Sequence, residues 1–147
     1  MEIEMEFEGL DKLQEAFQTL ATDAQVQQVE RRIVTRCRDY AAIKMAEKVP
    51  KSRDNSKSGK KGYRPPGHAA SNVPVSGIRT AGGLPFATVG WEKADSSAFF
   101  YVKFIEWGTH KMQPRDFIYT TLNECRATWD KFAENEIQSF ISDKLGG

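Results

Sequence analysis

Two long segments carry apolar residues at helical spacing, and this feature restricts the possible folds more than any other. Across Ala24–Val49 the apolar side chains recur every three or four residues, and the opposite face is rich in Gln and Arg. Pro50 ends this segment, because the residue before a proline disfavours the helical conformation. The same spacing covers Phe117–Lys144, with Asp116 as the predicted N-cap. Each predicted helix must bury its apolar stripe against another layer of the fold.

Shorter segments alternate between apolar and polar residues, which predicts strands. The alternation is strict over Glu2–Glu8 and weaker over Val73–Arg79 and Phe86–Trp91, with a predicted turn at Gly82–Gly83. Three antiparallel strands are about the minimum for a stable sheet, provided that a helix covers the apolar face. The sequence therefore predicts an α+β fold, in which a small antiparallel sheet packs against two long helices. A further short helix is predicted at Asp11–Ala21.

The stretch Lys51–Thr80 differs in composition, with few large apolar residues and many Ser, Gly, Pro and Asn residues. Seven of its residues are basic and one is acidic, a local net charge of +6 in a chain of 147 residues with net charge +1. Such a segment cannot bury enough surface to offset its chain entropy, so we expect a long flexible basic loop within one domain spanning 1–147. It is either a solvated loop without a dedicated partner or a contact region for a protein or for DNA phosphates. The candidate contact residues are Lys51, Arg53, Lys57, Lys60, Lys61 and Arg64.

Several functional classes find little support in the sequence. It has no paired Cys or His spacing for a metal, no phosphate-binding loop and no nucleophile elbow, so we expect no cofactor and no enzymatic activity. An enzyme that uses Glu106, His110 and Arg115 is the alternative. Cys37 and Cys125 are interpreted as free thiols in a reducing compartment. No apolar run is long enough to span a membrane, and the acidic N-terminus is unlike a secretory leader.

The most hydrophobic stretch is Phe99–Phe117, whose first part is interrupted only by Lys103 and Glu106. Periodicity does not separate a strand from a short helix here, but Gly108 favours a helix that ends at this residue. Glu106 lies between two large apolar residues, and an unpaired buried carboxylate is costly. Its carboxylate is therefore expected either to reach solvent or to pair with a nearby cation and hold the following turn. The candidate cations are His110, Lys111 and Arg115.

This stretch resembles the head–tail joining proteins of long-tailed bacteriophages, also described as neck, tail-completion or gp-ten-like morphogenesis proteins. That family has an aromatic residue, then a hydrophobic–Glu–aromatic–Gly–Thr run, a basic turn and a proline-containing start of a final helix. The residues that match are Tyr101, Ile105, Glu106, Trp107, Gly108, Thr109, Lys111, Met112, Pro114, Arg115 and Phe117. Asp116 stands where the family commonly has a second proline.

The resemblance implies a structural virion protein with no active site. Its motif residues Tyr101, Glu106, Gly108, Thr109, Pro114, Arg115 and Phe117 would be structural. The chain would form a ring of identical copies, expected to be a hexamer in the virion, with a monomer as the alternative for the isolated protein. Its partners would be the head connector or stopper and the tail tube, and its location the virion neck, after assembly in the host cytoplasm. DNA in the channel is a further possible contact, and a sequence-independent nucleic-acid-binding module that uses 51–64 is the alternative function.

Overall fold

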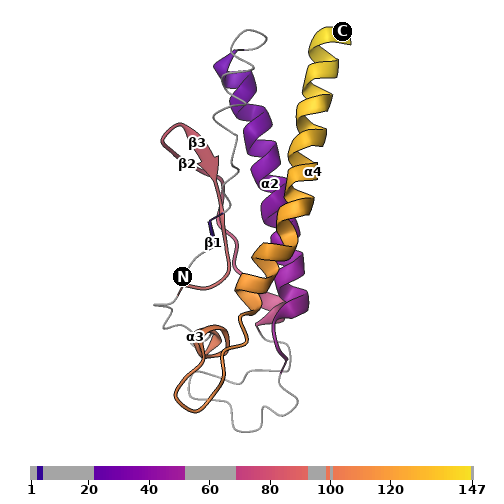
Figure 1. The fold of residues 1–147 in the computed structure, drawn as a ribbon. Coiled ribbons are helices and arrows are strands. Elements are labelled where there is room, and N and C mark those ends of the chain that lie inside the picture. Colours follow the sequence, from indigo (N-terminus) through magenta and orange to yellow (C-terminus); the bar gives the residue numbers. More distant parts are fainter. Residues whose placement is uncertain (1–2, 5–21, 52–68, 93–98, 100, 147) are drawn as a thin grey trace.

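The computed structural model describes residues 3–4, 22–51, 69–92, 99 and 101–146, and two long helices dominate it (Figure 1). Helix α2 (Asp23–Lys48) has 26 residues and α4 (Phe117–Gly146) has 30. The two helices lie side by side and run in opposite directions (Figure 1). The remaining elements are β1 (Ile3–Glu4), the 3₁₀ helix η1 (Ala70–Asn72), β2 (Arg79–Ala81), β3 (Leu84–Phe86), β4 (Thr88–Val89) and α3 (Val102–Trp107).

Local sequence explains where α2 begins and ends. The Thr22 hydroxyl accepts a hydrogen bond from the Gln25 N–H at 3.3 Å, and the Gln25 side chain accepts one from the Thr22 N–H at 3.1 Å. This reciprocal capping box satisfies two N–H groups that have no partner within the helix. At the other end the Val49 N–H donates to the Met45 carbonyl at 2.9 Å, directly before Pro50. The predicted helix Ala24–Val49 is therefore confirmed almost to its ends.

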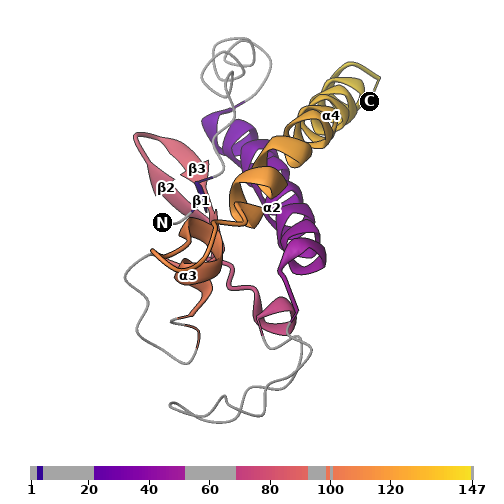
Figure 2. The ribbon, with the colours of Figure 1, turned by 60° about the horizontal axis from the view of Figure 1, so that its bottom comes forward.

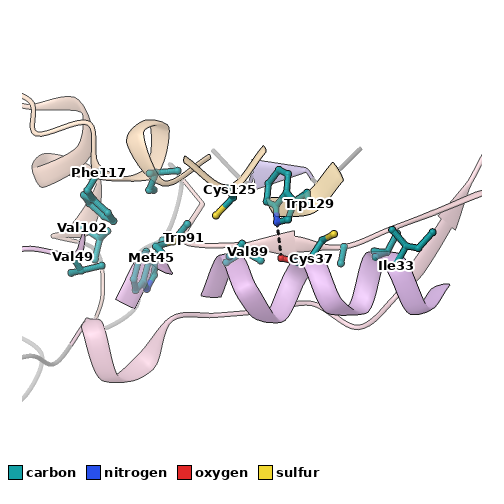
Figure 3. Packing of buried hydrophobic residues seen from close by; sticks show 14 of the residues in the cluster. Ile33, Cys37, Met45, Val49, Val89, Trp91, Val102, Phe117, Cys125 and Trp129 are labelled. Carbon is teal, nitrogen blue, oxygen red and sulfur yellow. Dashed lines mark hydrogen bonds between the residues drawn. The ribbon is translucent and has the colours of Figure 1, made fainter. Parts of the chain in front are cut away.

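The α2–α4 pair forms the main core of the described chain. The Trp129 indole N–H of α4 donates to the Cys37 carbonyl of α2 at 3.0 Å, and this bond is buried (Figure 3). Nearby, the rings of Tyr40 and Phe132 meet edge to face with centroids 5.5 Å apart. Ion pairs flank this core on the surface, with Arg36 to Glu136 at 3.2 Å as one example. Apolar burial supplies most of the stabilisation here, because exposed ion pairs contribute little.

The strands form a small antiparallel arrangement against α2, as predicted. Strands β2 and β3 make a hairpin in which Ala81 pairs with Leu84, and both glycines of the two-residue turn have positive φ, 59° at Gly82 and 81° at Gly83. Two positive φ values define the type I′ turn, which suits the twist of a hairpin. Strand β4 pairs with β1, and both β3 and β4 contact α2. Figure 2 shows the β2–β3 hairpin beside α2. The α+β class with a small sheet on long helices is confirmed.

Several predicted boundaries change. Within Val73–Arg79, Val75 forms an isolated β-bridge with Val89, and the strand β2 begins at the last residue, Arg79. The strand predicted at Phe86–Trp91 is instead divided between β3 and β4 by Ala87. The flexible stretch predicted to Thr80 is too long, because residues 69–80 belong to the fold and Ala69 is part of the core. Residues 52–68, the helix predicted at 11–21 and most of the strand predicted at 2–8 lie outside the described residues.

Candidate functional site: the α3–α4 clasp

Helix α3 ends at Gly108, as the sequence predicts. The Gly108 N–H donates to the Phe104 carbonyl at 2.9 Å, and the φ angle of Gly108 is 73°. A Cβ atom at this position would lie 2.7 Å from the Met112 carbonyl oxygen and 2.7 Å from the Pro114 nitrogen. Both atoms belong to the backbone, so they cannot move aside as a flexible side chain could. Glycine is thus required here by the backbone conformation and by the close approach of the following turn.

The turn after Gly108 folds back on itself. Thr109 and Met112 exchange two backbone hydrogen bonds of 2.9 and 3.2 Å, and the Thr109 hydroxyl accepts a third from the Lys111 N–H at 3.2 Å. The chain then returns to α3, where the Arg115 N–H donates to the Ile105 carbonyl at 2.9 Å. The Arg115 bond satisfies a carbonyl group at the end of α3 that has no partner within the helix.

The Glu106 carboxylate connects α3 to the first turn of α4. One of its oxygens accepts a hydrogen bond from the Ile118 N–H at 2.8 Å, and the other accepts one from the Tyr119 N–H at 3.3 Å. The Glu106 carbonyl also accepts a bond from the Asp116 N–H at 3.3 Å. A carboxylate at a helix N-terminus is favoured by the unpaired N–H groups and by the helix dipole. We call this arrangement the clasp, defined by Ile105, Glu106, Arg115, Asp116, Ile118 and Tyr119.

Glu106 is buried, with 4% of its surface exposed, although it carries a titratable group. Burial raises the pKa of its carboxyl group above the ordinary value, and the negative charge of Asp116 acts in the same direction. The backbone N–H donors of α4, those of Ile118 and Tyr119 foremost, lower the pKa, but burial has the larger effect. The hydrogen bonds from the N–H groups of α4 therefore favour the charged form of Glu106, whereas burial in the clasp favours the protonated form.

Both sequence predictions for Glu106 are wrong. Its carboxylate neither reaches solvent nor pairs with the side chains of His110, Lys111 or Arg115, and its partners are backbone N–H groups twelve and thirteen residues along the chain. Spacing could not reveal this, because every residue type except proline can supply a backbone N–H group.

The Asp116 prediction also needs correction. The residue has a φ of 47°, away from the extended conformation usual for an N-cap, although its carbonyl accepts from the Thr120 N–H at 2.9 Å. The side chain that accepts from the first N–H groups of α4 is that of Glu106.

The remaining residues of the family-like motif divide between the core and the surface. Phe117 is buried and meets the Trp91 ring edge to face, with centroids 6.2 Å apart, and Figure 3 shows both residues in the core. Tyr101 is half-buried just before α3, whereas Thr109 and Pro114 are exposed in the turn.

The structure does not unite the proposed acid–base group of Glu106, His110 and Arg115. Glu106 is buried and its two oxygens are occupied, while the other two side chains are exposed. Such an arrangement lacks the enclosed site and free acid or base that general acid–base catalysis requires.

A shallow hollow of about 270 Å³ lies elsewhere, at the junction of the strands. Its lining includes Arg79, Trp91 and Glu92, and the buried indole N–H of Trp91 has no hydrogen-bond partner among the described residues.

The described residues contain no cluster of His, Cys, Asp or Glu that could hold a metal ion. Burial raises the pKa of the Cys125 thiol to about 11, and Cys37 is likewise buried with a raised pKa. Both thiols are therefore poor nucleophiles.

Three exposed apolar side chains lie on the segments that the clasp joins. Phe104 on α3, Met112 in the turn and Tyr119 in the first turn of α4 are 40%, 37% and 63% exposed. The exposed side chains of Lys111 and Arg115 lie in the same turn. Large apolar side chains with cations at their margins are typical of protein-contact surfaces.

Of the six predicted cationic contact residues, Lys51 lies within the described residues and is exposed. The other five, Arg53, Lys57, Lys60, Lys61 and Arg64, lie outside them.

Among the described residues, none of the helices combines the length and the apolar composition that a membrane span requires. Comparisons with protein-family models, curated proteins and solved structures found no match for the chain.

Proposed function

We propose that this chain is a structural protein of a tailed-phage particle that joins head and tail by forming a ring between the head connector and the tail tube. The proposal rests on the resemblance of residues 101–117 to the head–tail joining family. The observation that carries it is the use of Glu106: both carboxylate oxygens cap α4, so the most distinctive residue of the motif has a structural task. A motif whose polar residues hold the fold together suits a protein that acts through its surfaces.

The exposed residues around the clasp support the same proposal. Phe104, Met112 and Tyr119 present apolar area on segments that the clasp holds in a defined position. Contacts on a preorganised surface lose less conformational entropy on binding than contacts on a flexible one. We assign this surface to contact with an adjoining ring protein.

The direct test is electron microscopy of particles assembled without this protein. Filled heads and finished tails that fail to join are the expected result, and normal virions would contradict the proposal. Complementation with His110→Ala should restore joining, because the side chain is exposed and outside the clasp. The enzyme alternative expects the same variant to abolish function.

The nucleic-acid-binding alternative makes a different prediction. If cations of the 51–64 segment neutralise phosphates, the purified protein binds DNA with an affinity that falls steeply as salt is added. Under the head–tail joining proposal, free DNA binds weakly, and replacing Lys57, Lys60 and Lys61 by Gln leaves joining intact unless these residues contact the partner ring. Fluorescence anisotropy with labelled duplex DNA at several salt concentrations separates the two functions.

A further inference from the structure

Residues 73–81 form one side of the small strand arrangement. Val75 bridges to Val89, and farther along the chain β2 pairs with β3, beginning with Arg79 opposite Phe86. The chain advances four residues from Val75 to Arg79, while the opposite side advances three, from Val89 to Phe86. The 73–81 side therefore contains one extra residue, as in a β-bulge, and this residue shifts the alternation of its backbone groups.

The backbone N–H and C=O groups of Val75 point away from the strand that it bridges. The Ser76 N–H donates to the Thr88 carbonyl at 2.9 Å, and the Gly90 N–H donates to the Pro74 carbonyl at the same distance. In an antiparallel ladder, two such bonds flank a pair whose own backbone groups face outward, and Val75 belongs to that pair. Neither backbone group of Val75 has a hydrogen-bond partner among the described residues, and 48% of the residue is exposed.

Thr80 on β2 has the same orientation. The pair Ala81–Leu84 closes a two-residue turn and exchanges hydrogen bonds, whereas the next pair, Thr80–Pro85, does not. Pro85 has no N–H group, which agrees with this phase. Because the extra residue lies between them, the backbone groups of Val75 and Thr80 point to the same outer side. Strand β3 contacts α2, and β2 lies on the far side of β3 from α2 (Figure 2).

This outer edge is held in position by bonds on its inner side. The Arg38 guanidinium of α2 donates to the Ser76 carbonyl at 3.0 Å, and the Ser76 hydroxyl accepts from the Thr88 N–H at 2.8 Å. Val75 and Arg79 both line the shallow hollow at the strand junction. The Arg79 side chain is exposed and makes no ion pair within the described part of the chain. The edge therefore offers preformed backbone groups beside an unpaired cation.

We propose that this edge binds an extended segment of a partner protein, which adds a strand beside residues 73–81 and places an acidic residue opposite Arg79. Outward N–H and C=O groups on a strand edge are matched by the backbone of another strand. Opposite charges across the pair stabilise such an addition, and the preformed edge lowers its entropic cost. Residues 73–81 contain no acidic residue, so the same edge of a second copy cannot supply the carboxylate. The inference goes beyond the proposed ring contact and does not rest on it.

A blocked peptide of about eight residues that alternates Val and Glu is a direct probe. We expect saturating peptide to slow amide hydrogen exchange at Val75 and Thr80 by about tenfold, as measured by NMR, because each N–H gains one hydrogen bond. Exchange at Ser76 and Gly90 should hardly change, since their N–H groups are already bonded on the inner side. The same peptide with every amide N-methylated is the control, and it should not bind.

Variants of the protein test the backbone and the charge separately. Val75→Pro removes the outward N–H without removing a hydrogen bond of the described fold, and it should weaken peptide binding by about tenfold. Val75→Thr keeps the N–H and should bind as wild type does. Arg79→Glu should reverse the preference, so that a peptide that alternates Val and Lys binds about threefold more tightly than the Val–Glu peptide. Thermal unfolding of each variant shows whether it is folded.

Three results would overturn the proposal. They are unchanged exchange at Val75 with millimolar Val–Glu peptide, equal binding of the N-methylated peptide, and a peptide preference that Arg79→Glu leaves unaltered. Self-association in sedimentation velocity that Val75→Pro abolishes would assign the edge to a second copy, and it would overturn the proposal as well. The joining of heads and tails is measured on particles, so failure of the edge proposal can be distinguished from failure of the proposed function.

Discussion

The two halves of α4 have the same helical pattern in sequence but different surroundings. In the first half, Phe117, Cys125 and Trp129 are buried, whereas in the second half Phe132 and Phe140 are half-buried. The first half lies between α2, Trp91 and the clasp, and the C-terminal end of α4 points away from the sheet and α3 (Figure 1). The apolar stripe in the sequence predicts which face of a helix is buried. The extent of burial at each position depends on which other elements pack against it.

This difference predicts unequal contributions to stability along one helix. Trp129→Ala should lower the free energy of unfolding by about 3–5 kcal/mol, because it leaves a cavity and removes the indole bond to the Cys37 carbonyl. Phe140→Ala should cost only about 1–2 kcal/mol, since less apolar surface leaves solvent contact at that position. Urea unfolding followed by circular dichroism measures both values. Similar losses for the two variants would show that the halves are equally covered.

The clasp end of α4 also depends on a backbone requirement, at Gly108. Gly108→Ala should destabilise the protein by about 3 kcal/mol, because it combines a left-handed backbone with contacts of 2.7 Å to two backbone atoms. Gly77→Ala is the matched control, since a Cβ there meets nothing within 4 Å. Thermal unfolding of both variants should show a large decrease in Tm for the first and little change for the second. An unchanged Tm for Gly108→Ala would contradict this account of the turn.

Loss of the capping carboxylate should have an intermediate effect. Glu106→Ala leaves the N–H groups of Ile118 and Tyr119 without their acceptor at the start of α4, at a cost of about 2 kcal/mol. Amide hydrogen exchange by NMR should show faster exchange at these two residues than in wild type. Exchange near Phe140 should hardly change. Uniform acceleration along α4 would indicate a global effect and not a local cap.

The smallest predicted effect is a dependence of stability on pH. Burial raises the pKa of Glu106 in the folded state, so the folded protein binds this proton more readily than the unfolded chain. Tighter binding of this proton by the folded state adds to the free energy of unfolding. This addition is fully present below the pKa of Glu106 in the unfolded chain, and it is lost as the pH rises through the pKa of Glu106 in the folded protein. The stability of wild type relative to Glu106→Gln should therefore decline between about pH 4 and the raised folded pKa, and then level off. A constant difference, or one that increases with pH, would contradict this assignment.

Local chemistry in the sequence was sufficient to predict α2, α4 and the short helix that ends at Gly108, together with the glycine hairpin and the α+β class. Periodicity, a proline stop and glycine turns act over a few residues, so they can be read without knowledge of the rest of the fold. Tertiary structure decided three other features: the hydrogen-bond partners of Glu106, the division of the last strand into β3 and β4, and the inclusion of residues 69–80 in the fold. Each depends on contacts between distant segments. Where the contact is with a backbone group, the residue type does not indicate it.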